Sequence, residues 1–497
     1  MKKLSIIIIT GAVILSGCSK SYFDINQNPN SPSNASVDLV LASALKTSAG
    51  FQVTTFQTIS EWMGYWSPSG SYALSSSDGA SYKQTTDFYD AVWQALYRNL
   101  EDYDYVERTA TANNQYFYIA AAKTMKAYIF KELVDMFNDV PYTQALKGTT
   151  VIHPAYDKGK DIYEALSTEL GTAVTLFQRG DATAVSGEDI LYGPVPLGVT
   201  SVTQAVENGS WAKFANSLRL RLLIQQTSVS GRAAYIQTEI NKILANGAGF
   251  LTADAAVNPG YSNSSGKANP IWGFSIGLSG AYTQDFWRAA KYTIDFCVAH
   301  NDPRYKFLYA PIGNGTWVGT VPGSTVNPAG NLSSTFGAGI LKSVGQSAVI
   351  FEAAESYLLQ AEAGMRGFIA NTPATLFNTG VQASFTYLGA GSAAAYTSQP
   401  DKQTNYSFCI NDAERLACII RQKWMAFNSI TPLEAWNDWR RTGYPADILI
   451  SVHPNIDQPP TIPIRILYPT SEYQTNLANV SGEGTINHHT SKIWWMP

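Results

Sequence analysis

The sequence predicts a mainly α-helical fold of paired helices, with a loop-rich face and few short strands. Apolar residues recur at helical spacing in four long segments. Between the segments lie stretches rich in Gly, Ser, Asn and Pro, at 64–86, 251–282, 309–347 and 388–411. Hydrophobic residues make up 45% of the 497 residues and charged residues 14%, which excludes a disordered chain and indicates a large buried core.

The first residues have the features of a bacterial lipoprotein signal peptide. Two lysines precede an apolar run over 4–15 that is too short to cross a bilayer comfortably. The run ends in LSGC at 15–18, which resembles a lipobox, the motif whose cysteine is acylated before cleavage just upstream. We therefore expect a signal peptide over 1–17 and a lipid anchor on Cys18, to which each buried CH₂ contributes about 0.8 kcal/mol.

A tether and one large domain are expected to follow. Residues 18–35 are rich in Ser, Asn and Pro, as an extended lipidated tether would be. No later apolar run is long enough to span a membrane, and no linker divides 36–497 into two domains. The formal net charge of −4 disfavours nucleic acid as a partner.

The helical segments run over 118–133, 211–222, 354–368 and 416–427. Thr372-Pro373 and Thr431-Pro432 predict two more helix starts, because Thr favours the N-cap and Pro the first helical position; Glu434 follows as in a capping box. Small residues occur where neighbouring helices would approach each other. This pattern suggests hairpins stacked as in tetratricopeptide repeats, in degenerate form because no strict period of about 34 residues is visible.

A set of short segments occurs in a fixed order along almost the whole chain: the lipobox, YFDIN at 22–26, NPN at 28–30, FNDVPY at 137–142, WAKFANSLRLR at 211–221, QKW at 422–424, EAWNDWRRTGYP at 434–445 and RILYP at 465–469. Together these segments resemble the SusD/RagB family of nutrient-binding outer-membrane lipoproteins. The resemblance implies a SusD-like fold of four degenerate tetratricopeptide units, no cofactor, and a surface lid over a SusC-like TonB-dependent transporter. The lid would bind oligosaccharides and deliver them; oligopeptides are the alternative cargo.

These shared motifs are expected to be structural. Trp436, Trp439 and Tyr444 would pack the end of a helix. Arg440 and Arg441 would cap its carbonyls or pair with acidic residues.

The ligand is instead expected to lie on the loops. A sugar ring presents an apolar C–H face and a rim of hydroxyls, so it needs an aromatic platform beside planar hydrogen-bonding groups. Backbone groups of the same loops could hold a peptide, which residue type does not exclude. The expected contacts are Trp62, Tyr65, Trp66, Tyr72 and Asp78 in segment 62–78, Tyr261, Asn269, Trp272, Tyr282 and Trp287 in segment 261–288, and Trp317.

A surface hydrolase is the competing class, and the sequence lacks its signatures. There is no HExxH, GxSxG or phosphate-binding loop, so we expect no enzymatic activity. The five histidines are scattered, and His488-His489 cannot present two ligands from one helix face; we expect this pair at the surface and no metal site. Cys297, Cys409 and Cys418 lack zinc-site spacing, and the sequence leaves open whether 409 and 418 form a disulfide.

Overall fold

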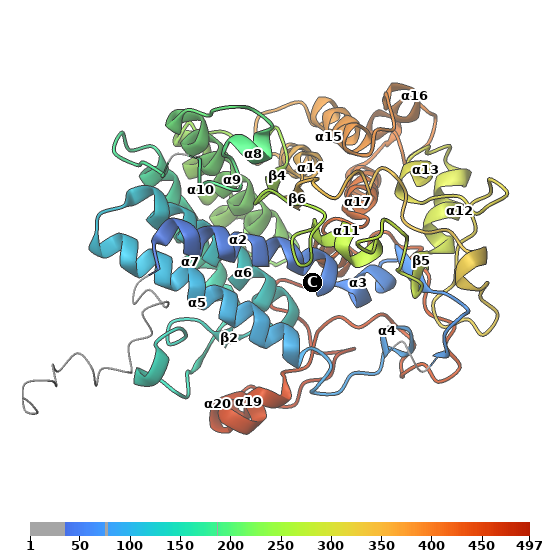
Figure 1. Ribbon diagram of the computed structural model, residues 1–497, viewed down its shortest axis with the longest axis horizontal. Coiled ribbons are helices and arrows are strands. Elements are labelled where there is room, and N and C mark those ends of the chain that lie inside the picture. Colours follow the sequence, from blue (N-terminus) through green and yellow to red (C-terminus); the bar gives the residue numbers. More distant parts are fainter. Residues whose placement is uncertain (1–34, 75–77, 186) are drawn as a thin grey trace, which may run out of the picture.

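The computed structural model describes residues 35–74, 78–185 and 187–497. The predicted signal peptide, Cys18 and the tether up to residue 34 therefore lie outside the described residues, as do residues 75–77 of the first predicted ligand segment. Most of the described chain forms helices, with loops gathered at one end (Figure 1). The mainly α-helical prediction is confirmed.

The first group of helices follows chain order. Each helix packs against the next, which is the arrangement expected of stacked hairpins. Its central helix, α6, is apolar on nearly all sides and is almost wholly buried between its neighbours. The group consists of α5 (Asp90–Ala112), α6 (Tyr116–Phe137), α7 (Gly159–Phe177), α9 (Gln204–Gln225) and α10 (Ala233–Ala245), with α2 (Val37–Thr54) laid across α5 and α6.

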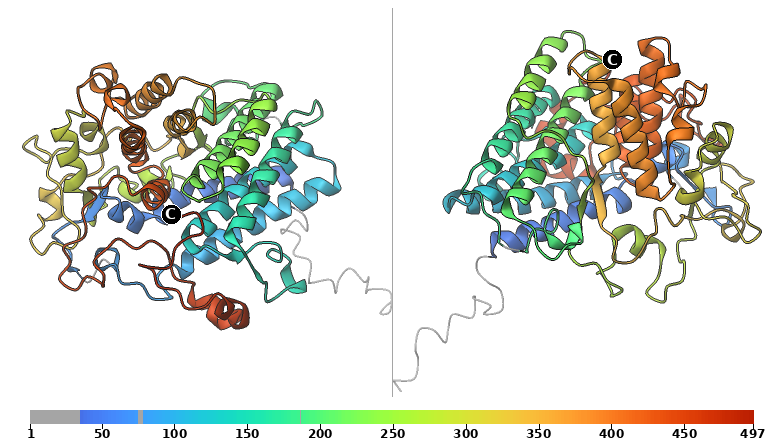
Figure 2. Two further views of the ribbon diagram at one scale, coloured as in Figure 1. Left: turned by 180° about the vertical axis from the view of Figure 1, so that it is seen from behind. Right: turned by 90° about the horizontal axis from the view of Figure 1, so that it is seen from above.

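The second group lies beside the first, as the right-hand view of Figure 2 shows. In it, α14 packs against α15, α17 and also α9, and so joins the two groups. The group consists of α14 (Ala353–Met365), α15 (Pro373–Leu388), α17 (Asp412–Phe427) and α18 (Pro432–Thr442).

The remaining elements are short, as predicted. Three two-stranded antiparallel sheets are present in the described residues. They pair β1 (Trp66–Pro68) with β5 (Trp287–Ala289), β2 (Val140–Pro141) with β3 (Tyr156–Asp157), and β4 (Ala255–Val257) with β6 (Ala348–Phe351). The short helices are α3 (Gln57–Trp62), α4 (Asp78–Ser81), α8 (Pro194–Leu197), α11 (Pro270–Ser275), α12 (Lys291–Ala299), α13 (Tyr305–Leu308), α16 (Ala394–Thr397), α19 (Thr470–Thr475) and α20 (Leu477–Gly482).

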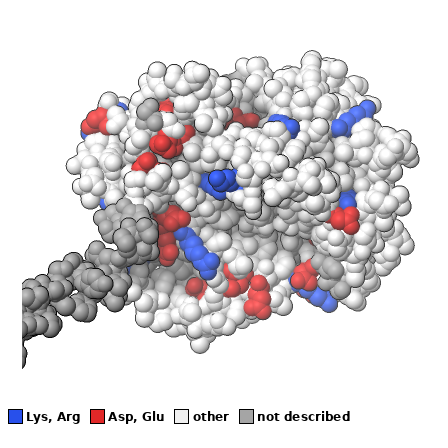
Figure 3. All heavy atoms as spheres, in the orientation of Figure 1, with Lys and Arg blue, Asp and Glu red and all other residues white. Residues whose placement is uncertain are grey.

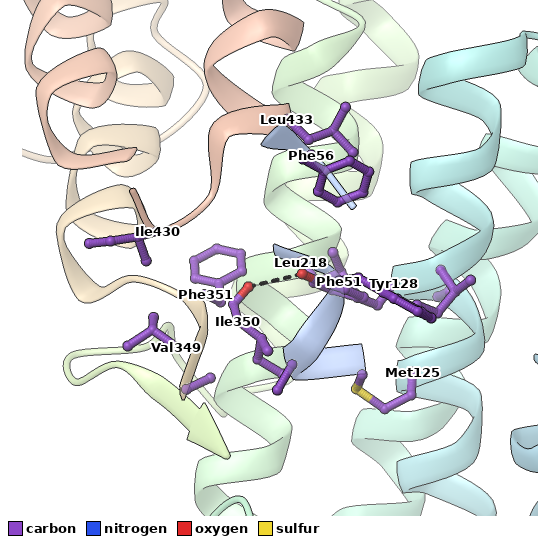
Figure 4. Close-up of a cluster of buried hydrophobic side chains, with 14 of the residues drawn as sticks. Phe51, Phe56, Met125, Tyr128, Leu218, Val349, Ile350, Phe351, Ile430 and Leu433 are labelled. Atoms are coloured by element: carbon purple, nitrogen blue, oxygen red, sulfur yellow. Dashed lines mark hydrogen bonds between the residues drawn. The ribbon is translucent and has the colours of Figure 1, made fainter. Parts of the chain in front are cut away.

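The core is centred where the two helix groups meet. Figure 4 shows Tyr128 of α6 and Leu218 of α9 beside Phe351 of β6 and Leu433 of α18. The Tyr128 hydroxyl donates to the carbonyl of Ile350 at 3.2 Å, which satisfies a polar group inside the cluster. The two groups therefore share this core, and a second, smaller cluster of buried residues lies among α14, α15 and α17.

Two helix termini differ from the prediction. The segment predicted as helical to 368 ends at Met365, because Gly367 adopts a left-handed φ of +79°. At the start of α18 the Thr431 hydroxyl does not cap the helix; it donates to Glu352 at 3.2 Å. Glu434 points inward and accepts from Lys131 at 2.7 Å, because burial of that lysine requires a carboxylate partner.

The arginines of the EAWNDWRRTGYP motif are structural, as expected. Arg441 is fully buried and contacts Glu362 at 2.6 Å and Asp438 at 2.8 Å. Arg440 donates to the backbone carbonyls of Asp135, at 2.7 Å, and Ile464, at 3.0 Å. The motif thus ties α18 to α14, to α6 and to the C-terminal loop.

Glu132 makes stability depend on pH. Burial raises its pKa to about 8, with a further contribution from the charge of Glu434, so the folded protein keeps a proton that the unfolded chain loses near 4.5. The contribution of the protonated Glu132 carboxyl to the free energy of unfolding is complete below about pH 4.5. It is lost at about 1.4 kcal/mol per pH unit as the pH rises toward 8. We expect Glu132→Gln to remove this dependence, measured by urea unfolding across that range.

The exposed variant Glu101→Gln on α5 controls for the loss of a carboxylate. A difference between Glu132→Gln and the wild type that stays constant with pH would contradict the assignment.

The cysteines in the described residues are free thiols. Cys297, Cys409 and Cys418 are all buried. A hydrogen bond with Cys418 lowers the pKa of the Cys409 thiol, so the two groups lie in contact without a covalent bond. None of the described helices is long and apolar enough to cross a membrane.

Candidate ligand-binding site

Two of the predicted ligand segments lie side by side. β1 pairs with β5, which places Trp66 opposite Ala289 and Pro68 opposite Trp287. Beyond the strands, the Ser69 amide donates to the carbonyl of Phe286 at 2.8 Å. Segments more than 200 residues apart in the sequence therefore form one surface.

A third loop, 321–330, completes this surface. The Gly70 backbone amide donates to the carbonyl of Pro328 at 2.8 Å, and the side-chain amide of Asn327 donates to the carbonyl of Pro68 at 3.2 Å. A side chain at Gly70 would bring its Cβ within 1.9 Å of the Asn327 carbonyl oxygen, so the close approach requires glycine. Main-chain groups and the Asn327 side chain therefore hold the two loops together.

The loops enclose a cleft of about 220 Å³. Tyr72 is the aromatic side chain among the described lining residues and is 42% exposed. Ser324 and Thr325, which carry hydroxyl groups, also line the cleft, and no described lining residue is charged. The lining consists of Pro68, Ser69, Gly70, Tyr72, Ala73, Leu74, Ala80, Gly323, Ser324, Thr325 and Asn327.

A row of aromatic rings supports Tyr72 from below. Tyr72 meets Phe286 edge-on, with ring centroids 5.0 Å apart, and Phe286 meets Trp287 in the same way at 4.8 Å. Trp287 contacts Trp66 at 6.1 Å, and Trp66 contacts Phe336 at 4.8 Å. The packing restricts the motion of the exposed Tyr72 ring, which lowers the entropy cost of binding a ligand against it.

Six predicted contact residues lie in the core and do not line the cleft. Each is at most 7% exposed, and several place a polar atom where the interior needs one. The Trp62 indole donates to the Gly79 carbonyl at 3.0 Å, and Asn269 accepts from two amides at the start of α11. The loop-rich half has few regular elements, so large aromatic side chains build its core. The six residues are Trp62, Tyr65, Trp66, Tyr261, Asn269 and Trp287.

The other five predicted residues remain accessible. Tyr72 and Asp78 are exposed; Asp78 begins α4, whose Ala80 lines the cleft. Trp272, Tyr282 and Trp317 are half-buried and lie outside the lining.

Two of these half-buried residues can be described further. Burial raises the pKa of Tyr282 to about 12, so its hydroxyl stays protonated. The Trp317 indole donates to the Tyr309 carbonyl at 2.9 Å and its ring meets Tyr305 edge-on. Of the predicted set, the structure brings only Tyr72 and Asp78 to the cleft or its edge. Ser324 and Thr325 belonged to a stretch that the sequence marked as a loop, with no signal of its own for binding.

Charge separates this cleft from a cavity among the helices of the first group. Figure 3 shows charged side chains of both signs scattered sparsely over the face drawn there. A cavity of about 210 Å³ between α5, α6 and α7 is instead lined by ion pairs, among them Lys123–Glu107 at 2.7 Å and Lys126–Asp104 at 2.8 Å. Its charged groups satisfy one another. The cleft beside Tyr72 suits a neutral, hydroxyl-bearing ligand.

Comparison with known proteins extends this description. Among solved structures, a chitin-binding protein is 24% identical (TM-score 0.73), with 92% of this chain and 99% of the other covered. A chitin-binding SusD homologue from Flavobacterium johnsoniae is 23% identical (TM-score 0.74; 92% and 98% covered). A SusD homologue from Bacteroides fragilis is 22% identical (TM-score 0.73; 93% and 99% covered). These likenesses establish the fold.

The sequence comparisons give the family. No curated protein matches the chain significantly. The SusD-like family model, described as "Starch-binding associating with outer membrane", matches residues 29–469. The match covers nearly the whole chain, and this protein therefore belongs to the SusD-like family.

Proposed function

We propose that this chain is a surface lipoprotein of the outer membrane that binds oligosaccharides and delivers them to a SusC-like TonB-dependent transporter. Family membership supports the general role, since the family is described as starch-binding and associated with the outer membrane. The observation that carries the ligand class is the cleft whose described lining is uncharged and combines an exposed ring, Tyr72, with the hydroxyl-bearing residues Ser324 and Thr325.

The cleft can hold a sugar through two kinds of contact. The Tyr72 ring offers a flat apolar surface to the C–H face of the sugar. The hydroxyls of Ser324 and Thr325 can exchange hydrogen bonds with the sugar hydroxyls. One exposed ring and a few hydroxyls give weak binding with fast release, which suits a protein that passes its cargo on.

The anchor and the transporter complete the proposal. An acylated Cys18 would hold the domain at the membrane, and residues 18–35 would let it move over a nearby barrel. Such tethering raises the effective concentration of the lid at its partner. Purification from native outer membranes should recover the chain together with a TonB-dependent barrel.

We expect Tyr72→Ala to weaken oligosaccharide binding about 5- to 30-fold, corresponding to about 1–2 kcal/mol. The thermal midpoint should stay nearly unchanged, because the ring is largely exposed. Isothermal titration against a panel of oligosaccharides and oligopeptides measures the first effect and calorimetric unfolding the second.

Tyr105→Ala, on α5 in the helical half, is the matched control and should bind as the wild type does. Binding of peptides with no saccharide bound would identify peptide as the cargo and refute the glycan proposal. Cleavage of a bound glycan by the purified chain would contradict the binding role.

A further inference from the structure

Asp457, His488 and His489 converge in the C-terminal part of the chain. The Nε2 atom of His488 lies 3.0 Å from Oδ2 of Asp457, and Nε2 of His489 lies 3.6 Å from the same oxygen. One potential ligand atom from each residue falls within 4.8 Å of the others. The prediction of a surface histidine pair is wrong, since His488 and His489 are 8% and 7% exposed.

Their convergence has a simple cause. The two histidines lie in a turn and not in a helix, so consecutive side chains can point the same way, with ring centroids 4.2 Å apart. The backbone fixes this arrangement: the His489 amide donates to Asn487 at 2.8 Å, and the His488 carbonyl accepts from Ile464 at 2.8 Å. Across the site, the Asp457 amide donates to the carbonyl of Ser81 at 2.8 Å. The three side chains are therefore held in place from separate segments.

The imidazole of His489 is positioned so that its Nε2 atom could bind a metal ion. Its Nε2 atom is buried and has no hydrogen-bond partner among the residues that the structure describes. Its Nδ1 atom lies 3.3 Å from the Thr461 hydroxyl, so a proton on Nδ1 leaves the Nε2 lone pair directed at the carboxylate. A buried nitrogen lone pair facing a carboxylate oxygen is costly unless a cation or proton lies between them.

We propose that Asp457, His488 and His489 bind one zinc ion. Two imidazole nitrogens and a carboxylate oxygen are a ligand set that zinc accepts, whereas calcium and magnesium prefer oxygen alone. Tetrahedral bonds of about 2.0–2.1 Å place ligand atoms about 3.3 Å apart, between the 3.0 and 3.6 Å separations found here. The Asp457 side chain is 33% exposed, so water can take the fourth position.

The ion would act as a cross-link. It would fasten the C-terminal turn that carries His488 and His489 to the loop that carries Asp457. That loop contacts Ser81 of α4, next to Ala80 in the wall of the ligand cleft. The proposal does not depend on the identity of the ligand bound there.

The test is zinc titration of the full chain, stripped with EDTA and free of any polyhistidine tag. We expect one zinc per chain by calorimetry and by elemental analysis, together with a higher thermal midpoint. His489→Gln and Asp457→Asn should each weaken zinc binding at least about 100-fold. His153→Gln, an equal change at an exposed histidine, should bind zinc as the wild type does.

Two further measurements keep the result independent of misfolding. The variants are compared with the wild type by circular dichroism without zinc, and Asp457→Asn changes a partly exposed, nearly isosteric group. Cobalt in place of zinc should give a tetrahedral absorption spectrum in the wild type that both variants lose. The proposal would be overturned if the wild type bound no zinc, or if both variants bound zinc as tightly as the wild type does.

Discussion

Arg441→Met should destabilise the protein by about 3–5 kcal/mol, because it removes a buried cation that pairs with two buried carboxylates. Glu362 is fully buried, and the neighbouring Arg441 and Arg366 hold its pKa near 2. Asp438 also contacts Arg441 at 2.8 Å. Methionine keeps most of the apolar volume, so the loss measures the charge and its hydrogen bonds. Urea unfolding at neutral pH gives the free energy of unfolding.

Arg415→Met is the matched control. Arg415 pairs with Asp412 at 2.9 Å, but Asp412 is exposed and Arg415 is only half-buried, and such surface pairs contribute about 0–1 kcal/mol. Equal losses for the two variants would show that the Arg441 cluster is no more important than a surface pair. The Glu362 contribution should be present above about pH 4.5 and be lost as the pH falls toward 2, because folding lowers the pKa of this carboxyl.

Trp66→Ala is the second change with a large expected effect, about 3–5 kcal/mol of unfolding free energy. The side chain is 1% exposed and packs against Phe274, Trp287 and Phe336. Its indole donates to the Ser429 hydroxyl at 2.8 Å, so the alanine variant loses a hydrogen bond as well as packing. Thermal and urea unfolding measure the loss.

Trp66→Phe keeps an aromatic ring and should lose less stability than Trp66→Ala. Tyr72→Ala, at the exposed end of the same row of rings, should lose almost none. If Trp66→Ala proved as stable as the wild type, Trp66 would not belong to the core. The two alanine variants thus separate support of the cleft from contact with its ligand.

The long helices could be predicted because the spacing of their apolar residues along the sequence shows which face of each helix is buried. The apolar residues over 118–133, 211–222 and 416–427 recur at the helical period, and each segment lies within one helix, α6, α9 or α17. The structural role of the arginines in the 434–445 motif followed similarly, because buried guanidinium groups require acidic or carbonyl partners.

Burial in the loops could not be predicted in this way. The residues around Trp66 lie more than 200 positions further along the chain, and no local period reveals such contacts. Asn269 shows the same difficulty, since its amide links the start of α11 to Gln346. For His488 and His489, the prediction assumed helical geometry and therefore missed that a turn can direct both rings to Asp457.

The contact between Gly70 and the 321–330 loop has a consequence for which substitutions the cleft can accept. The join uses main-chain groups and Asn327, whereas Ser324 and Thr325 stand at the wall of the cleft. Substitutions at these two wall positions would alter what the cleft recognises and leave the join intact. Ligand specificity could therefore diverge among related proteins through these two positions, while the fold that supports the cleft stays the same.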